Sequence, residues 1–352
     1  MKHIIGAKSA PVPAAVPPAR LVTVDEGSAG QRLDNFLLRE LKGVPKTLVY
    51  RIIRSGEVRL NKGRAGADSR VQPGDRVRVP PLRTAPASAA VQARPAPARE
   101  FPLLWEDEHL LAIDKPAGVA VHGGSGVSFG VIEQLRQARP QARFLELVHR
   151  LDRETSGILL LAKKRSALTA LQDQFRNRAT GKTYLALVAG AWPANRKVID
   201  QPLHKFLQAD GERRVRVVGR DDPDGMRAVT LVRVLRRLQL GAAGSAPGAG
   251  VPPAEAKADG SCSLLEVTIK TGRTHQIRVH LAAAGHPIAG DDKYGDFERN
   301  KTLARRGLKR MFLHAWRLQF DHPASGERIE LLAELPPELQ RLLPPSAPES
   351  PP

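Results

Sequence analysis

The sequence predicts an α+β protein made of two ordered blocks, at about 21–83 and about 100–340. In the smaller block, two stretches with helical spacing are followed by short alternating strands. In the larger block, apolar strand-like runs are interleaved with amphipathic helical segments. Between the blocks, the Pro/Ala-rich stretch 84–99 has neither periodicity, so it predicts an extended linker.

Three further segments lack the periodicity of ordered structure. Residues 1–20 are rich in Pro and Ala and predict a disordered arm. Residues 241–260 interrupt the larger block between two strand-like segments, which predicts a flexible surface insertion. The Pro-rich end, 341–352, predicts a loose tail. The length of 352 residues suits one larger domain plus a smaller module.

The elements of the smaller block follow one another simply. Apolar residues recur with helical spacing over 33–41 and again over 48–53, and Pro45 stands near the start of the second helix, where its missing N–H costs little. A Pro-Gly-Asp turn at 73–75 leads into a strand in which valines alternate with arginines. Two short helices and short strands therefore make a small α+β module.

Positive charge dominates the chain and this block in particular. The whole sequence has 55 Lys and Arg against 36 Asp and Glu, a net charge of +19. An excess of this size attracts polyanions, of which nucleic acid is the commonest. A codon bias that favours Arg, Ala, Pro and Gly is the competing explanation. Residues 30–83 alone carry 13 Lys and Arg against five Asp and Glu, or +8.

Three of these cations lie where they could meet phosphates. Lys46, Arg51 and Arg54 fall off the apolar stripe of the second helix. The block resembles the S4 RNA-binding domain through RLDNFL at 32–37, the run 51–61 and VQPGDRVRVP at 71–80. The resemblance implies a helix pair laid on structured RNA, and the alternative is a basic face that is only solvated.

The cysteine content and the hydropathy pattern indicate in which cellular compartment the protein is expected. Cys262 is the only cysteine, which excludes an intrachain disulfide and gives no hint of a thiolate metal site. Prolines break every apolar run near the N-terminus, so we expect no signal peptide, and no stretch approaches the length of a membrane span. These features predict a reducing, cytoplasmic setting and no membrane partner.

The segment 149–157 of the larger block is polar and stands between strand-like runs at 144–148 and 158–162. Such loops are where a fold displays functional groups. Within it, Asp152 has Arg150 and Arg153 on either side. Nearby positive charge favours an ionised carboxylate, which suits a nucleophile or a base. The alternative is a structural aspartate that caps a turn.

Other residues whose side chains could bind a metal or a phosphate form no recognisable motif. His275, His280 and His286 do not have the spacing of a metal site, and we expect them to form hydrogen bonds; no metal is predicted. The glycines at 123–126 are not followed by the Gly-Lys-Ser/Thr of a phosphate-binding loop. Lys163 and its basic neighbours either hold phosphates or are surface charge.

Three segments of the larger block resemble the pseudouridine synthase family that includes the ribosomal large subunit enzymes. They are HRLDRETSG at 149–157, GRTHQIRVHLAAAGHPIAGD at 272–291 and AIDKPAGVAVH at 112–122. With the S4-like block, the similarity extends from about 21 to 335. It implies a catalytic domain over 100–340 with a mixed, mainly antiparallel sheet and a cleft that holds Asp152.

The resemblance also implies roles for individual residues. Asp152 is the essential aspartate that attacks the target nucleotide, through a covalent adduct or a glycal-type intermediate that the sequence does not distinguish. Tyr184, which we expect to open a strand, packs on the target base and assists proton removal from C5. Arg278, on the first turn of a helix, pairs with the aspartate. Arg150 fills the gap that the base leaves in the RNA, because a planar guanidinium can stack there.

The resemblance therefore predicts that this chain isomerises specific uridines of 23S, large-subunit ribosomal RNA to pseudouridine. It adds RNA contacts by Arg153, Arg273 and His275. Isomerisation changes no redox state, so we expect no cofactor, and we expect a monomer. The first alternative is a non-catalytic S4-type RNA-binding or ribosome-assembly factor, and the second is an RNA glycosylase or nuclease.

Overall fold

The computed structural model describes residues 18–41, 44–82, 96–124, 129–208, 212–240 and 260–343. The chain divides into two units, residues 1–95 and 96–352, and each is described by itself. Most of the predicted arm, linker, insertion and tail (1–17, 84–95, 241–259 and 344–352) lies outside the described residues. Among the described residues, no helix combines the length and the apolar character that crossing a bilayer requires.

The N-terminal unit has the predicted helix pair and strands. Its helices are α1 (Leu33–Glu40) and α2 (Lys46–Arg54), and a short 3₁₀ turn η1 (Glu26–Ser28) precedes them. Its antiparallel sheet has the order β1-β4-β2-β3. The four strands are β1 (Arg20–Thr23), β2 (Arg59–Leu60), β3 (Gly63–Arg64) and β4 (Arg76–Val79).

The apolar stripes of both helices form the core of this unit, as their spacing predicted. Phe36 and Leu37 of α1 pack with Ile52 of α2 and with Val77 of β4, and all four side chains are buried. The polar face of α2 remains in solvent, so the packing that shapes the unit also determines which of its cations are exposed.

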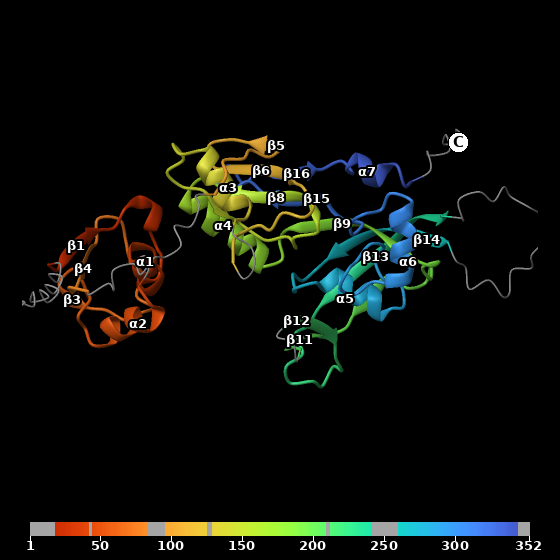
Figure 1. Ribbon diagram of the computed structural model, residues 1–352. Coiled ribbons are helices and arrows are strands. Elements are labelled where there is room, and N and C mark those ends of the chain that lie inside the picture. The colour runs from red at the N-terminus through yellow and green to blue at the C-terminus, as the bar shows by residue number, and fades with distance from the viewer. Residues whose placement is uncertain are drawn as a thin grey trace, which may run out of the picture. The chain divides into compact units, whose positions relative to one another are not determined.

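A mixed sheet organises the C-terminal unit, in the order β10-β13-β14-β9-β15-β8-β6-β5, with β16 beside β15 and β7 beside β8 (Figure 1). Strands β8 and β15 are parallel and every other pair is antiparallel, which confirms the predicted mixed, mainly antiparallel sheet. The strands are β5 (Leu103–Glu106), β6 (Leu110–Lys115), β7 (Glu146–Leu147), β8 (Ser156–Ala162), β9 (Gly181–Ala189), β10 (Val198–Asp200), β13 (Val229–Gln239), β14 (Ser261–Ile269), β15 (Leu313–Asp321) and β16 (Arg328–Leu332).

Helices cover both faces of this sheet. The alternating side chains of β8 explain why: Leu160 joins the core beneath α4 (Arg165–Arg176), whereas Leu159 joins the core beneath α3 (Val131–Ala138). Near β13 and β14, one core contains α5 (Gln276–Ala283), and another contains α6 (Phe297–Arg305) and α7 (Pro337–Gln340) (Figure 1). A separate antiparallel hairpin consists of β11 (Leu203–Leu207) and β12 (Arg213–Val217).

Two details bear on the sequence predictions. Tyr184 does not open its strand, because β9 begins three residues earlier at Gly181. Polar and glycine residues at the start of β9 hid this extension from the apolar pattern. The predicted insertion does lie between two strands: β13 and β14 flank it, and the Leu240 N–H donates to the Gly260 carbonyl at 2.7 Å.

Candidate active site

The loop between β7 and β8 displays Asp152. The neighbouring Leu151 is buried and anchors the loop, while the side chain of Asp152 is 20% exposed. The imidazole of His149 accepts a hydrogen bond from the Leu160 N–H of β8 at 3.1 Å. Burial, followed by the charge of Lys182, lowers the pKa of His149 to about 4, so this acceptor is neutral at physiological pH.

A buried lysine holds the other side of the loop. The Nζ of Lys115 donates to the carbonyls of Pro116, Val119 and Arg153 at 2.8, 2.9 and 3.1 Å. These bonds tie the end of β6 to the residue directly after Asp152. Burial, helped by the charge of Arg310, lowers the pKa of Lys115 to about 7. The position of the catalytic candidate therefore depends on a group deep in the fold.

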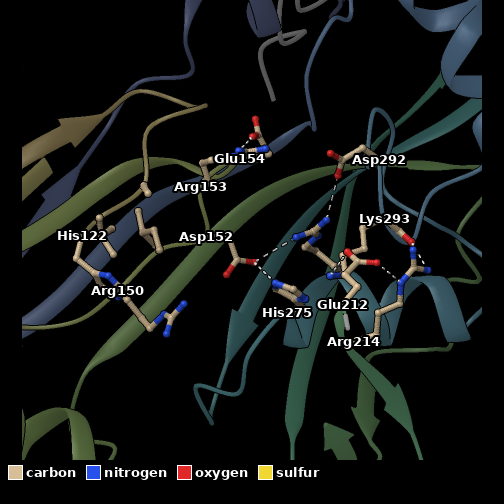
Figure 2. Close-up of a pocket in the computed structure, with 14 residues that line it drawn as sticks. His122, Arg150, Asp152, Arg153, Glu154, Glu212, Arg214, His275, Asp292 and Lys293 are labelled. Atoms are coloured by element: carbon tan, nitrogen blue, oxygen red, sulfur yellow. Dashed lines mark hydrogen bonds and ion pairs between the residues drawn. The ribbon is translucent and has the colours of Figure 1, made fainter. Parts of the chain in front are cut away.

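The partners of Asp152 come from a distant part of the chain. Its Oδ2 lies 3.6 Å from Nη1 of Arg278 and 3.9 Å from Nε2 of His275 (Figure 2). The sequence neighbour Arg153 instead pairs with Glu154 at 2.7 Å, and these two side chains lie away from the carboxylate in Figure 2. The expectation that flanking arginines supply the positive charge is thus corrected: Arg278 supplies it.

Arg278 is itself fixed by a second carboxylate. It is buried on the first turn of α5, as predicted, and its Nε and Nη2 donate to the two oxygens of Asp291 at 2.8 and 2.7 Å. Burial of Asp291 acts to raise its pKa, but the hydrogen bonds and charge of Arg278 and two backbone N–H groups hold it below its ordinary value. The guanidinium also lies over the ring of Tyr294, 5.2 Å from its centroid.

His275 belongs to the same cluster. It precedes α5 with φ 52°, a left-handed conformation unusual for a residue other than glycine. Its Nδ1 is 2.9 Å from the hydroxyl of Tyr294. Burial lowers the pKa of His275 against the opposing charge of Asp152, which favours a neutral imidazole. This geometry places His275 on the wall next to Asp152.

Tyr184 reaches the same place from β9. It lines, with Asp152 and Arg278, a pocket of about 120 Å³. Burial and then the charge of Asp152 raise the pKa of Tyr184 well above its ordinary value. The phenol therefore stays protonated at neutral pH and acts first as a hydrogen-bond donor. To take a proton from a substrate carbon, it would have to pass its own proton on.

A second hollow, of about 350 Å³, opens on the other side of Asp152. Figure 2 shows His122 and Arg150 on one side of this hollow and Lys293, Glu212 and Arg214 on the other. The two hollows share Arg150, Leu151, Asp152, His275 and Arg278. Together they form one cleft, called here the active-site cleft, with the carboxylate of Asp152 at its centre.

The predicted RNA-binding residues fall into two groups. Arg150 and Arg273 line the active-site cleft, and the Nε of Arg273 donates to the Arg227 carbonyl at 3.2 Å. Lys46, Arg51 and Arg54 are exposed on α2 of the N-terminal unit, opposite its buried face. They form an exposed cationic face of that unit.

Histidines near the cleft form hydrogen bonds, as expected from their spacing. His280 bonds to Thr230 and the Gln201 carbonyl, and His286 bonds to the Ala189 carbonyl. Lys163 and Lys164 pair with Glu106 and Glu108, which favours the surface-charge interpretation. Among the described residues, one group with metal-type donors within 4.8 Å of one another lies elsewhere: His204, Asp222 and Asp224.

Sequence reasoning missed three residues of the site. Asp291 and Tyr294 follow Arg278 by 13 and 16 positions, and their roles depend on the turn that brings them back to α5. Lys115 looked like an ordinary charge at a strand end. For Lys115 the available signal was a charge at the end of the apolar run 110–113, since a charge next to buried residues must find a partner, whereas nothing in the polar run 290–296 distinguished Asp291 or Tyr294.

Comparisons with known proteins identify the family of the chain. Residues 109–283 match the RNA pseudouridylate synthase family model, and residues 31–77 match the S4 domain model. The chain is 47% identical to ribosomal large subunit pseudouridine synthase C of Pasteurella multocida, over 92% of this chain and 93% of that protein. Its identity to the protein of the same name from Escherichia coli K12 is 46%, over 93% and 96%.

Solved structures show the same relationship. Human RNA pseudouridylate synthase domain containing 1 is similar with a TM-score of 0.53 and 25% identity, covering 69% of this chain and 87% of that one. Human RNA pseudouridylate synthase domain containing 4 gives 0.52 and 28%, covering 68% and 91%. Asp152, Tyr184 and Arg278 all lie inside the matched segment, and the chain belongs to the RNA pseudouridylate synthase family.

Proposed function

We propose that this chain isomerises specific uridines of large-subunit ribosomal RNA to pseudouridine, with Asp152 as the nucleophile. One observation carries the proposal: a partly exposed carboxylate lies at the centre of the cleft, 3.6 Å from a buried guanidinium. The names of the relatives, which are ribosomal large subunit enzymes, support the substrate. The exposed cations of the S4-type unit support binding to RNA.

Access to the nucleotide comes first. The glycosidic bond of a stacked uridine is inaccessible, so the base must be flipped out at a cost of a few kcal/mol. Arg150 is exposed at the cleft, and no carboxylate of the described residues lies within ion-pair distance of it. Its planar guanidinium is therefore available to stack and hydrogen-bond in the vacated space. Arg153, Arg273 and His275 are assigned supporting contacts to the RNA.

The bond changes then balance without a further reactant. An oxygen of Asp152 attacks ribose C1′, and the electron pair of the C1′–N1 bond leaves with the uracil. The uracil turns so that C5 faces C1′, C5 forms the new bond, and the carboxylate departs. C5 loses its proton and N1 gains one. A route through a glycal would use the same carboxylate as a base on the ribose.

Surrounding residues keep this carboxylate reactive. Arg278 is always charged, and its bonds to Asp291 hold it beside Asp152 in each step. We assign to Tyr184 the packing against the base, because it lines the pocket that contains Asp152 and its protonated phenol can donate a hydrogen bond. Because substrate and product are isomers, we propose that no cofactor is needed. We also propose a monomer that acts in the cytoplasm, where ribosomal RNA is modified.

The test uses transcripts of 23S ribosomal RNA labelled with tritium at uridine C5, because isomerisation releases that hydrogen. Asp152→Asn should lower the rate by at least about 10³-fold while RNA binding persists. Glu298→Gln, an exposed carboxylate on α6, serves as the matched control. Equal, measurable rates for Asp152→Asn and the wild type would remove Asp152 as the nucleophile, whereas no tritium release by the wild type would favour the non-catalytic RNA-binding alternative. Free uracil or cut strands would favour a glycosylase or nuclease.

A further inference from the structure

A basic groove of about 600 Å³ continues from the active-site cleft. It shares Arg150, Tyr184 and Arg273 with the pocket that contains Asp152. Its other walls come from the end of α4, the turn that follows and the start of β9. Six cations line this basic groove: Arg150, Arg176, Arg178, Lys182, Lys270 and Arg273.

The basic groove has little counter-charge. No carboxylate is among its lining residues, in the part of the chain that the structure describes. Arg176 forms an ion pair with Asp173 on the surface of α4. Neither Arg178 nor Lys182 lies within ion-pair distance of any described carboxylate. Like charges gathered in a concave surface attract anions, so the groove is suited to a polyanion.

Lys182 is held in place by its neighbours. It stands two residues before Tyr184 on β9, so both side chains lie on one face of the strand, about 7 Å apart along it. Its ammonium lies 5.1 Å from the ring centroid of Phe175, which in turn stacks on His149 at 5.0 Å. Burial and then the charge of Arg178 lower the pKa of Lys182, and a bound anion would oppose both effects.

Arg178 is a second cation of the basic groove, and its backbone conformation is unusual. It follows Asn177, the C-cap of α4, and has φ 61°. Glycine is the usual residue at this position, because a side chain is strained in left-handed backbone. The turn nevertheless carries an exposed arginine, whose charge acts on Lys182. An observed strain of this kind is a reason to look for a function.

We propose that Lys182 and Arg178 bind a backbone phosphate of the substrate RNA next to the flipped nucleotide. The RNA strand on one side of that nucleotide must leave the cleft, and the basic groove begins where Tyr184 meets the cleft. A phosphate in the groove would accept hydrogen bonds from both cations. The inference rests on the proposed function, because it names how that same site holds its substrate.

The experiment measures binding and turnover separately in the full-length protein. The variants are Lys182→Gln, Arg178→Gln and the double variant, with Lys182→Arg as the charge-preserving partner. Binding of a 23S transcript is measured from 50 to 200 mM salt in an Asp152→Asn background, so that it does not depend on conversion. Turnover is measured as tritium release from the same RNA with Asp152 intact.

We expect the double variant to raise the dissociation constant about tenfold and to flatten the log–log salt dependence by about one unit. At saturating RNA its kcat should stay within about threefold of the wild type. Lys182→Arg should restore binding. The exposed Lys309→Gln and Arg305→Gln, which lie outside the groove, should behave as the wild type does.

Two results would overturn the phosphate site. One is an unchanged dissociation constant and salt dependence in both single variants and the double variant. The other is a loss of kcat with unchanged binding, which would assign the cations to the base rather than to the backbone. Because Arg178 is exposed, Arg178→Gln keeps the test valid if Lys182→Gln folds poorly. Absence of conversion by the wild type would instead contradict the proposed function.

Discussion

Arg278 gives two of its three nitrogens to the buried carboxylate of Asp291, at 2.8 and 2.7 Å. The remaining nitrogen, Nη1, is the one that lies 3.6 Å from Asp152. A bidentate pair has a rigid plane, so Asp291 determines the direction from which Arg278 meets the carboxylate of Asp152. The site therefore depends on a residue that touches no substrate.

The first prediction concerns Asp291. Asp291→Asn should lower kcat about tenfold or more with little change in KM, because Arg278 loses its fixed orientation. It should also lower the free energy of unfolding by about 3–5 kcal/mol, because a buried guanidinium loses its counter-charge. Steady-state kinetics and urea denaturation measure the two effects.

The neighbouring Asp292 provides the control. It also approaches Arg278, at 3.5 Å, but its side chain is 71% exposed. Asp292→Asn should therefore cost less than about 1 kcal/mol, as exposed pairs do. Equal effects of the two substitutions would show that the bidentate geometry is unimportant.

The second prediction concerns Arg150. Arg150→Ala should lower kcat/KM about 10- to 100-fold, because a stacking contact with the RNA is lost. Arg150→Lys should restore little, since an ammonium stacks poorly. Arg153→Ala is the matched comparison, because Arg153 is already paired with Glu154. If Arg153→Ala were the more damaging change, the assignment of Arg150 to the vacated space would be wrong.

Most of the fold could be predicted from local pattern. Local pattern predicts α1, α2 and α4, because apolar residues recur along the one face of each helix that is buried. It also predicts β8, because a strand that is buried throughout is a continuous apolar run. The hairpin β11–β12 was not predicted. Its strands mix charged and apolar residues, and its partners, such as Lys293 with Glu212, lie about 80 positions away.

The site was predictable in part and for a different reason. Asp152, Tyr184 and Arg278 were found by their motifs, and the structure brings all three to one pocket. Local charge was misleading, because Arg153 turns to Glu154 while Arg278 arrives from α5. Which side chains meet across a cleft depends on tertiary geometry, and the spacing within one segment contains no information about it.

The third prediction is a dependence of stability on pH. His314 is fully buried, with Nδ1 2.8 Å from the Ser156 hydroxyl and Nε2 3.0 Å from the Ala333 carbonyl. Burial lowers the pKa of His314 from 6.5 to about 4. Between these values the unfolded chain binds the extra proton. The free energy of unfolding should therefore fall as the pH drops from 6.5 to 4, by about 3 kcal/mol from this group.

Urea denaturation at pH 7, 5.5 and 4 measures this slope. His314→Gln should be less stable than the wild type at pH 7 but should show a flatter pH dependence. His122→Gln, at an exposed position, should keep the wild-type slope. Parallel curves for His314→Gln and the wild type would remove His314 as the acid-sensitive group.

The fourth prediction concerns the N-terminal unit. Arg51→Gln with Arg54→Gln should weaken binding of 23S transcripts and flatten the salt dependence by one to two units, because both cations are exposed on α2. Arg51→Lys with Arg54→Lys should leave the salt dependence of binding unchanged, since both substitutions keep the charge. If the salt dependence of binding were the same with and without the glutamine substitutions, the cations of α2 would be only a solvated face that does not bind the RNA.

The hydrogen bond between Leu240 and Gly260 has a consequence for labelling the protein. It closes the β13–β14 hairpin at the end opposite to residues 270–278, and the nine residues of β14 span about 30 Å. A fluorescent dye attached beside Leu240 or Gly260 would therefore stand about one strand length from residues 270–278, which lead into the active-site cleft.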